Sequence, residues 1–278
     1  MLDGLDKIPW NRLQCAFGTA EDVPGALRDL QKTFDEGQDT ESALSYLFTS
    51  IWHQGTVYEA TSYAVPFLFE LAKDEGTPDR TDILNLLAAI ATGTSYWEVH
   101  DAVWTNLSAP TASKRAEIEA NKERERIWVA KARKSVEAGF DILKSITRGE
   151  PEIRLAAAHV LAQFPERSDN VGPILLSLLQ TETVPLYRAG LLLLLGQVGD
   201  QSSDSVSALR LATTSNESTE RLAAAVSIAK LQIKPIPGAA RELLDQALSS
   251  GELHDAFAGL PWDWEGEIDD DELSEKSI

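Results

Sequence analysis

One helical pattern is written three times between residues 151 and 231, and this repetition constrains the fold more than any other feature of the chain. The copies begin at Arg154, Arg188 and Arg221, 34 and 33 residues apart, and read RLAAAHVLAQF, RAGLLLLLGQV and RLAAAVSIAKL. The positions three, four, seven and ten after the arginine are apolar: Ala157, Ala158, Leu161 and Phe164; Leu191, Leu192, Leu195 and Val198; Ala224, Ala225, Ile228 and Leu231. On a helix with 3.6 residues per turn these positions form one stripe, so each copy has a face that must be buried.

The segments around these copies complete a repeating unit of two helices. Apolar helices are expected at residues 171–180 and 205–214, between successive copies, and Arg80 opens a fourth copy of the pattern. The residue eight places after the arginine is small in the first three copies, as Ala162, Gly196 and Ala229, so a neighbouring helix can come close. A period in the thirties with two helices per period predicts an all-α chain of the α-solenoid type.

The arginine-led helices resemble those of the HEAT-repeat family, in which the second helix of each hairpin opens with an arginine before an alanine-rich run. An acidic residue often precedes that arginine, and Glu150 and Glu217 stand four residues before theirs. Val184 takes this place in the middle copy, so an acid–arginine ladder is expected to be interrupted there. The sequence of residues 51–76 also resembles segments of bacterial HEAT-repeat proteins. The resemblance implies a right-handed α-solenoid of helical hairpins and, by itself, no particular chemistry.

We expect residues 1–260 to form a single solenoid domain with an insertion at about 93–126. Helices are predicted at about 23–35, 40–53, 59–72 and 238–249, with a short one inside 93–110. A long helix over about 113–147 is predicted to be charged and solvated in its first part and to pack on the array in its later part, which includes Ile127. The acidic tail, 261–278, is expected to be disordered.

The charge balance favours basic partners. The chain has 44 acidic and 25 basic residues, a formal net charge of −19, which repels nucleic acid and anionic lipid. Solubility alone is the alternative explanation. The single cysteine, Cys15, excludes a disulfide framework, the first residues lack a signal-peptide pattern, and the longest apolar run is too short to cross a membrane. A cytoplasmic location is the resulting expectation.

No catalytic, cofactor-binding or metal-binding residue is predicted. The four histidines, at positions 53, 100, 159 and 254, do not have metal-ligand spacing, and no phosphate-binding glycine loop is present. His100, beside Glu98 and Asp101, lacks a candidate nucleophile. The stretch 114–134 is locally basic, which HEAT-like alkylpurine DNA glycosylases exploit, but its interleaved charges also describe an ordinary exposed helix.

Aromatic and polar side chains in two segments are the candidate partner-binding residues. Tryptophan is a favoured anchor at protein interfaces. The candidates are Trp52, His53, Gln54, Tyr58, Tyr63, Trp97, His100 and Trp104. Trp262 and Trp264, in the acidic tail, are further interface candidates, with packing on the nearest repeat as the alternative for each of the tryptophans in the insertion and the tail.

These observations predict a non-catalytic protein that binds another protein through the concave surface lined by the second helix of each hairpin. Small acidic HEAT-repeat proteins resemble toxin-neutralising immunity proteins, so a basic toxin is the more specific expectation for the partner. A general assembly scaffold and a glycosylase-type DNA-binding enzyme are the rival interpretations.

Overall fold

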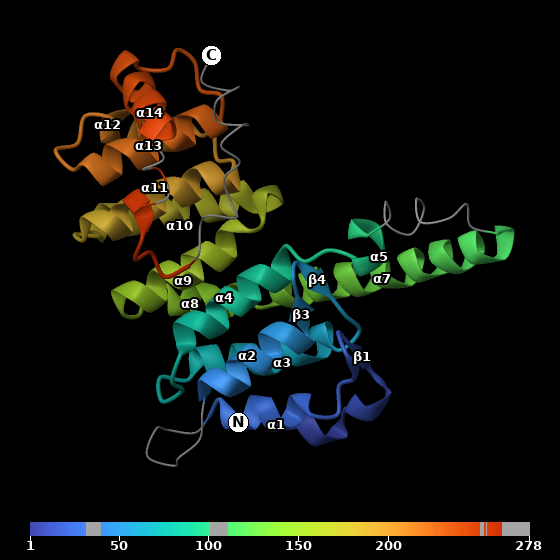
Figure 1. Cartoon of the computed structure of the whole chain (residues 1–278). Coiled ribbons are helices and arrows are strands. Elements are labelled where there is room, and N and C mark those ends of the chain that lie inside the picture. Colours follow the sequence, from blue (N-terminus) through green and yellow to red (C-terminus); the bar gives the residue numbers. More distant parts are fainter. Residues whose placement is uncertain (32–39, 101–110, 251–252, 254, 263–278) are drawn as a thin grey trace. The chain divides into compact units, whose positions relative to one another are not determined.

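The computed structural model describes residues 1–31, 40–100, 111–250, 253 and 255–262, and these residues are mainly helical (Figure 1). They divide into two compact units, one ending at Lys144 and the other beginning at Ser145. The all-α class is therefore confirmed in its coarse form. The single domain over residues 1–260 stays a prediction.

The first unit is built on three helices that pack on one another, α3, α4 and α7. Its elements are η1 (Leu5–Lys7), η2 (Trp10–Arg12), β1 (Gln14–Cys15), β2 (Gly18–Thr19), α1 (Val23–Asp29), α2 (Thr40–Ser50), β3 (Trp52–His53), β4 (Thr56–Val57), α3 (Thr61–Lys73), α4 (Arg80–Ala91), α5 (Tyr96–Val99) and α7 (Ala112–Ala138). The boundary between the units falls inside α8 (Phe140–Ile146). α4 begins at Arg80, where the fourth copy of the pattern was expected. The helix predicted over 23–35 ends at Asp29, and residues 32–39 lie outside the described part.

A small hairpin replaces the end of the helix predicted over residues 40–53. α2 stops at Ser50, and β3 pairs antiparallel with β4, Trp52 opposite Val57 and His53 opposite Thr56. The two residues of the turn, Gln54 and Gly55, have φ of 47° and 86°. Positive φ at both central positions is the requirement of the tight hairpin turn whose twist matches that of the strands. Gly55 therefore turns a hairpin and does not end a helix.

The long helix predicted over 113–147 is two helices, because the chain breaks at Gly139. A Cβ atom at Gly139 would lie 2.1 Å from the Phe69 ring, so glycine lets α3 approach at this point. The first half of α7 extends beyond α3 and α4 in Figure 1. Two expectations for it were wrong: Ile118 is buried in the part predicted to be solvated, and Ile127, expected to pack on the array, is exposed. Val136, in the same later part, is buried as expected.

The second unit contains the three repeated helices and the helices between them. Its elements are α9 (Pro151–Ala162), η4 (Pro165–Arg167), α10 (Ser168–Thr181), α11 (Pro185–Val198), α12 (Ser203–Ala212), α13 (Ser218–Lys230), α14 (Gly238–Ser250) and η5 (Asp255–Phe257). The helices predicted over 171–180, 205–214 and 238–249 are α10, α12 and α14. α11 packs on α9 and on α13, with α10 and α12 as a second layer. Residues 189–196 of α11 are all buried, as expected for the middle helix of a stack.

Close packing inside this stack depends on the small residue eight places after each arginine. A Cβ atom at Gly196 of α11 would lie 2.6 Å from Oγ and 2.9 Å from Cα of Ser227 in α13. The Ser227 hydroxyl donates a hydrogen bond to the Leu192 carbonyl at 2.8 Å. One place further along the pattern, Gln163, Gln197 and Lys230 form a chain of side-chain hydrogen bonds across the three helices. Residues that hold the same place in successive copies of the pattern, such as these three, therefore contact one another in the stack.

The acid–arginine ladder runs through the middle repeat, contrary to the expectation from Val184. Arg154 pairs with Glu182 at 2.6 Å, and Arg188 pairs with Glu220 at 2.8 Å. Each acid comes from the following repeat and not from the turn before its own arginine. The expected interruption was wrong because the pairing crosses between repeats, which a spacing rule within one repeat does not detect.

Candidate partner-binding surfaces

The β3–β4 hairpin presents three of the predicted partner-binding residues. Trp52 and His53 are half-buried, and Gln54 is exposed at the turn. The His53 ring lies edge-to-face on Phe17, whose side chain is 75% exposed, with ring centroids 5.0 Å apart. Trp52 packs edge-to-face on Phe48 of α2. The hairpin therefore shows one edge of an aromatic cluster at the surface, and Phe17 is a member of it that the sequence analysis did not single out.

The two predicted tyrosines differ in exposure. Tyr58 is buried, and its hydroxyl lies 2.7 Å from the Thr56 hydroxyl, so it supports the hairpin from inside. Burial raises the pKa of Tyr58, and the hydrogen bond with Thr56 opposes that rise. Tyr63, at the start of α3, is 38% exposed. Of these two residues, only Tyr63 is available to a partner without rearrangement.

The other predicted segment, around α5, is attached to both the hairpin and α7. Thr94 bonds to Gly55 and Val57 through the backbone, which joins this segment to the hairpin. The buried carboxylate of Glu125 in α7 accepts hydrogen bonds from the Ser95 hydroxyl at 2.8 Å and the Trp97 backbone N–H at 3.0 Å.

Within this segment Trp97 and His100 are half-buried, and His100 stacks on Tyr96 at 4.3 Å. Trp104 lies outside the described residues. The structure thus brings the described predicted residues of the two segments into one region of the first unit.

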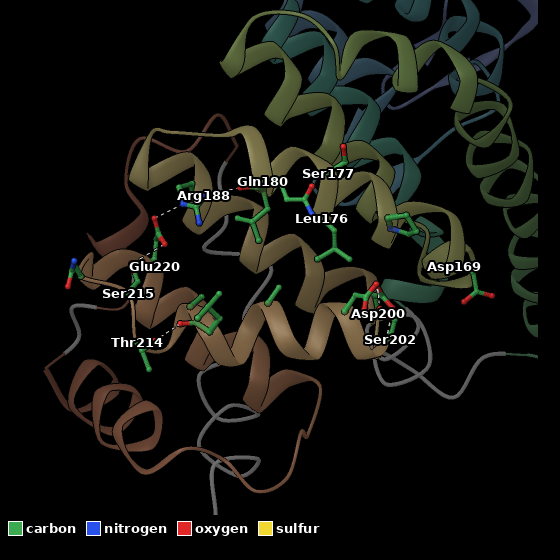
Figure 2. Close-up of a pocket in the computed structure, with 17 residues that line it drawn as sticks. Asp169, Leu176, Ser177, Gln180, Arg188, Asp200, Ser202, Thr214, Ser215 and Glu220 are labelled. Atoms are coloured by element: carbon green, nitrogen blue, oxygen red, sulfur yellow. Dashed lines mark hydrogen bonds and ion pairs between the residues drawn. The ribbon is translucent and has the colours of Figure 1, made fainter.

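A groove between α10 and α12 forms a hollow with a volume of about 1090 Å³. It follows both helices along their length. Figure 2 shows Asp169, Asp200 and Ser202 at one end, and Arg188, Thr214, Ser215 and Glu220 at the other. The hollow exists because α10 and α12 approach each other less closely than α11 and α13, which meet through glycine and serine.

The groove is acidic, and its four carboxylates fall into two kinds. Asp200 is buried and accepts hydrogen bonds from the Ser202 N–H and the Ser202 and Ser205 hydroxyls, while Glu220 is buried and paired with Arg188. Asp169 and Asp204 are exposed, and neither forms an ion pair with another described residue. The first kind holds the walls in place, and the second faces solvent in the first turns of α10 and α12.

Apolar side chains line the groove between its polar ends. Leu211 of α12 is 75% exposed, although Leu209, two residues earlier, is fully buried. Leu176 of α10 is half-buried on the opposite wall. This surface was not predicted, because the repeat pattern lies on the arginine-led helices and the groove lies on the helices between them. The sequence feature that could have indicated it is Leu211, a leucine in 205–214 that is not needed for one buried stripe.

The outward face of α9 and α11 is covered by the C-terminal segment of the same chain. Trp262 stacks on His159 of α9, with ring centroids 4.5 Å apart and planes 14° apart, and both are buried. A Cβ atom at Gly190 of α11 would lie 2.8 Å from Leu260 and 3.2 Å from Trp262. Packing on the nearest repeat, the alternative for Trp262, is therefore what is observed. Of the tail predicted to be disordered, 261–278, the structure describes residues 261–262 alone, and Trp262 is packed in this way. Trp264 and the other residues of 263–278 lie outside the described part.

No group of histidine, cysteine, aspartate and glutamate among the described residues is arranged to hold a metal ion. In the same part of the chain, no helix is both long and apolar enough to cross a bilayer. Comparison with protein-family models, curated proteins and solved structures found no match.

Proposed function

We propose that this chain is a non-catalytic, HEAT-like repeat protein that binds a basic protein partner. The observation that carries the proposal is the α10–α12 groove, which combines an exposed leucine with two exposed carboxylates, Asp169 and Asp204, that form no ion pair with a described residue. An apolar hollow with charges at its rim is typical of a surface that a partner covers. The net charge of −19 adds long-range attraction for a basic partner.

The repeat packing supports the solenoid part of the proposal. α9, α11 and α13 pack each on the next. The equivalent arginines Arg154 and Arg188 each pair with an acid of the following repeat, and residues at one equivalent place form the Gln163–Gln197–Lys230 chain. Repetition of one contact from unit to unit is the property that defines a solenoid. We propose a HEAT-like arrangement on this basis; its right-handed sense and a cytoplasmic location are proposed from the sequence alone.

A nucleic-acid role is less well supported. In the locally basic helix α7, Arg126 is paired with Glu98 and Glu123, Lys114 with Glu117, and Arg133 donates to the Ala91 carbonyl. Lys122 is buried. Basic side chains engaged in this way contribute little to a phosphate-binding surface, and the groove of the second unit is acidic.

Affinity capture with the purified chain tests the proposal. We expect immobilised protein to retain a basic protein from a lysate of its source cells at low ionic strength, and retention to fall as salt shortens the Debye length from about 30 Å to about 8 Å. The retained protein is then purified and its binding measured by titration calorimetry. Absence of any basic protein, or affinity indifferent to salt, contradicts the proposal.

The toxin-neutralising form of the proposal has a separate test. The captured partner is expressed alone and together with this chain in a bacterial host. A partner that arrests growth alone and not with this chain is the result expected of an immunity protein. A harmless partner favours the scaffold interpretation and leaves protein binding itself intact.

A further inference from the structure

We propose, resting on the proposed function, that the α10–α12 groove binds a single amphipathic helix of the partner, with apolar side chains on one face and lysine or arginine at one end. The length of the groove sets the length of that helix. Its lining runs along α10 from Asp169 to Gln180, eleven steps of about 1.5 Å each, or about 16 Å. An occupant of about eleven helical residues fills it.

The size of the groove is compatible with a helical occupant. Its volume of about 1090 Å³ is open to solvent, so the groove can take the apolar face of a helix and leave the opposite face in water.

The walls favour a helix over an extended segment. α10 and α12 satisfy their own backbone hydrogen bonds, so along their length they offer no strand edge to an extended chain. An occupant in this groove must satisfy its backbone internally, which a helix does. Recognition then rests on side chains, with Leu211 and Leu176 facing the apolar stripe of the occupant.

The charges define which end of the occupant is basic. Asp169 and Asp204 both stand where their helices begin, at one end of the groove. At the other end Glu220 is already paired with Arg188. An occupant therefore gains charge pairs only at the Asp169–Asp204 end, where its lysines or arginines are expected.

The layer that contains α9 and α11 is less open to a partner than the α10–α12 groove. Positions two and five after the arginine lie on the side of the helix opposite the buried stripe, and Gly190 and His159 hold these positions in α11 and α9. Leu260 and Trp262 cover both. A partner on that face would have to displace the C-terminal segment, whereas the groove is open.

The test uses defined peptides and charge-matched variants of the full chain. The probe is a fluorescein-labelled twelve-residue amphipathic peptide of leucine and lysine, with a leucine–glutamate peptide and a serine–lysine peptide as controls. The groove variants are D169K/D204K and L211N. Their matched controls are E242K/D245K, which makes the same charge change on exposed residues of α14, and V184N, an exposed apolar residue outside the groove. Circular dichroism and melting curves verify that each variant is folded.

By fluorescence anisotropy, we expect the leucine–lysine peptide to bind more tightly than either control peptide. D169K/D204K and L211N should each weaken that binding about tenfold, a loss of about 1.4 kcal/mol, and the matched controls about threefold or less. Equal losses in groove variants and matched controls overturn the inference.

The partner captured by the full chain separates the two proposals. If it still binds D169K/D204K and L211N as tightly as the matched controls, the groove assignment fails and the proposed function stands. If no basic protein binds the unsubstituted chain, the proposed function fails, whatever the peptides do.

Discussion

At the scale of single residues, the repeat stack is held at its spacing by side chains that are small where two helices meet. Gly196 is the clearest case, because a methyl group there would meet the Cβ and the backbone Cα of Ser227 as well as its hydroxyl. The small residue at this position could be read from the sequence. Its partner could not, because Ser227 lies 31 residues further along the chain and the pairing depends on how α11 and α13 cross.

Gly196→Ala is therefore expected to destabilise the second unit by about 1–3 kcal/mol, the usual cost of overpacking. Gly238→Ala is the matched control, since a Cβ atom at Gly238 would meet nothing within 4 Å. Urea unfolding measures both, and hydrogen exchange should show faster exchange in α11 and α13 for Gly196→Ala only. Equal stability of the two variants would show that the helices separate at negligible cost.

Glu182 makes the ladder sensitive to acid. Burial acts to raise its pKa, but hydrogen bonds from the Val184 N–H, the Arg154 guanidinium and the Thr183 N–H outweigh burial and lower the pKa below the ordinary glutamate value. A carboxyl with a lowered folded-state pKa stabilises the fold above its unfolded pKa, about 4.3, and this contribution is lost as the pH falls through the folded value.

Glu182→Gln should lower the free energy of unfolding at neutral pH by about 1–3 kcal/mol, because charge-assisted bonds become neutral ones. The difference from the unsubstituted chain should shrink as the pH falls below about 4.3. Thermal unfolding across the pH range checks this, with the exposed Glu242→Gln as control. A difference that stays constant down to about pH 3 would mean that the ladder does not titrate as the structure indicates.

At the scale of elements, the sequence located most helices but not the interruptions. The β3–β4 hairpin was missed because its turn is Gln54–Gly55, and glutamine is not among the residues that favour positive φ there. The break at Gly139 was missed because helical periodicity continues on both sides. The close approach of the Phe69 ring at this glycine comes from α3 and is equally hidden in the sequence.

The C-terminal segment is an element whose anchoring is a testable consequence of the structure. Trp262→Ala removes the ring that stacks on His159, and we expect a loss of about 3 kcal/mol in unfolding free energy. Leu211→Ala, at a side chain that is 75% exposed, should change stability by less than about 0.5 kcal/mol. Urea unfolding gives both values, and faster hydrogen exchange in α9 and α11 should accompany the first. Unchanged exchange there would contradict the anchoring.

At the scale of the whole molecule, the sequence determined features that depend on neighbouring residues, and the tertiary structure decided features that depend on residues far apart in the chain. The sequence by itself determined the helical class, the repeat and its buried stripe, and the strongly acidic charge, because each is a property of composition or of spacing within a dozen residues. The tertiary structure decided that Arg154 and Arg188 pair with acids of the following repeat, that Trp262 covers α9 and α11, and that α10 and α12 leave a groove between them. These depend on distances between residues far apart in the chain, and only the packing of helices against one another sets those distances.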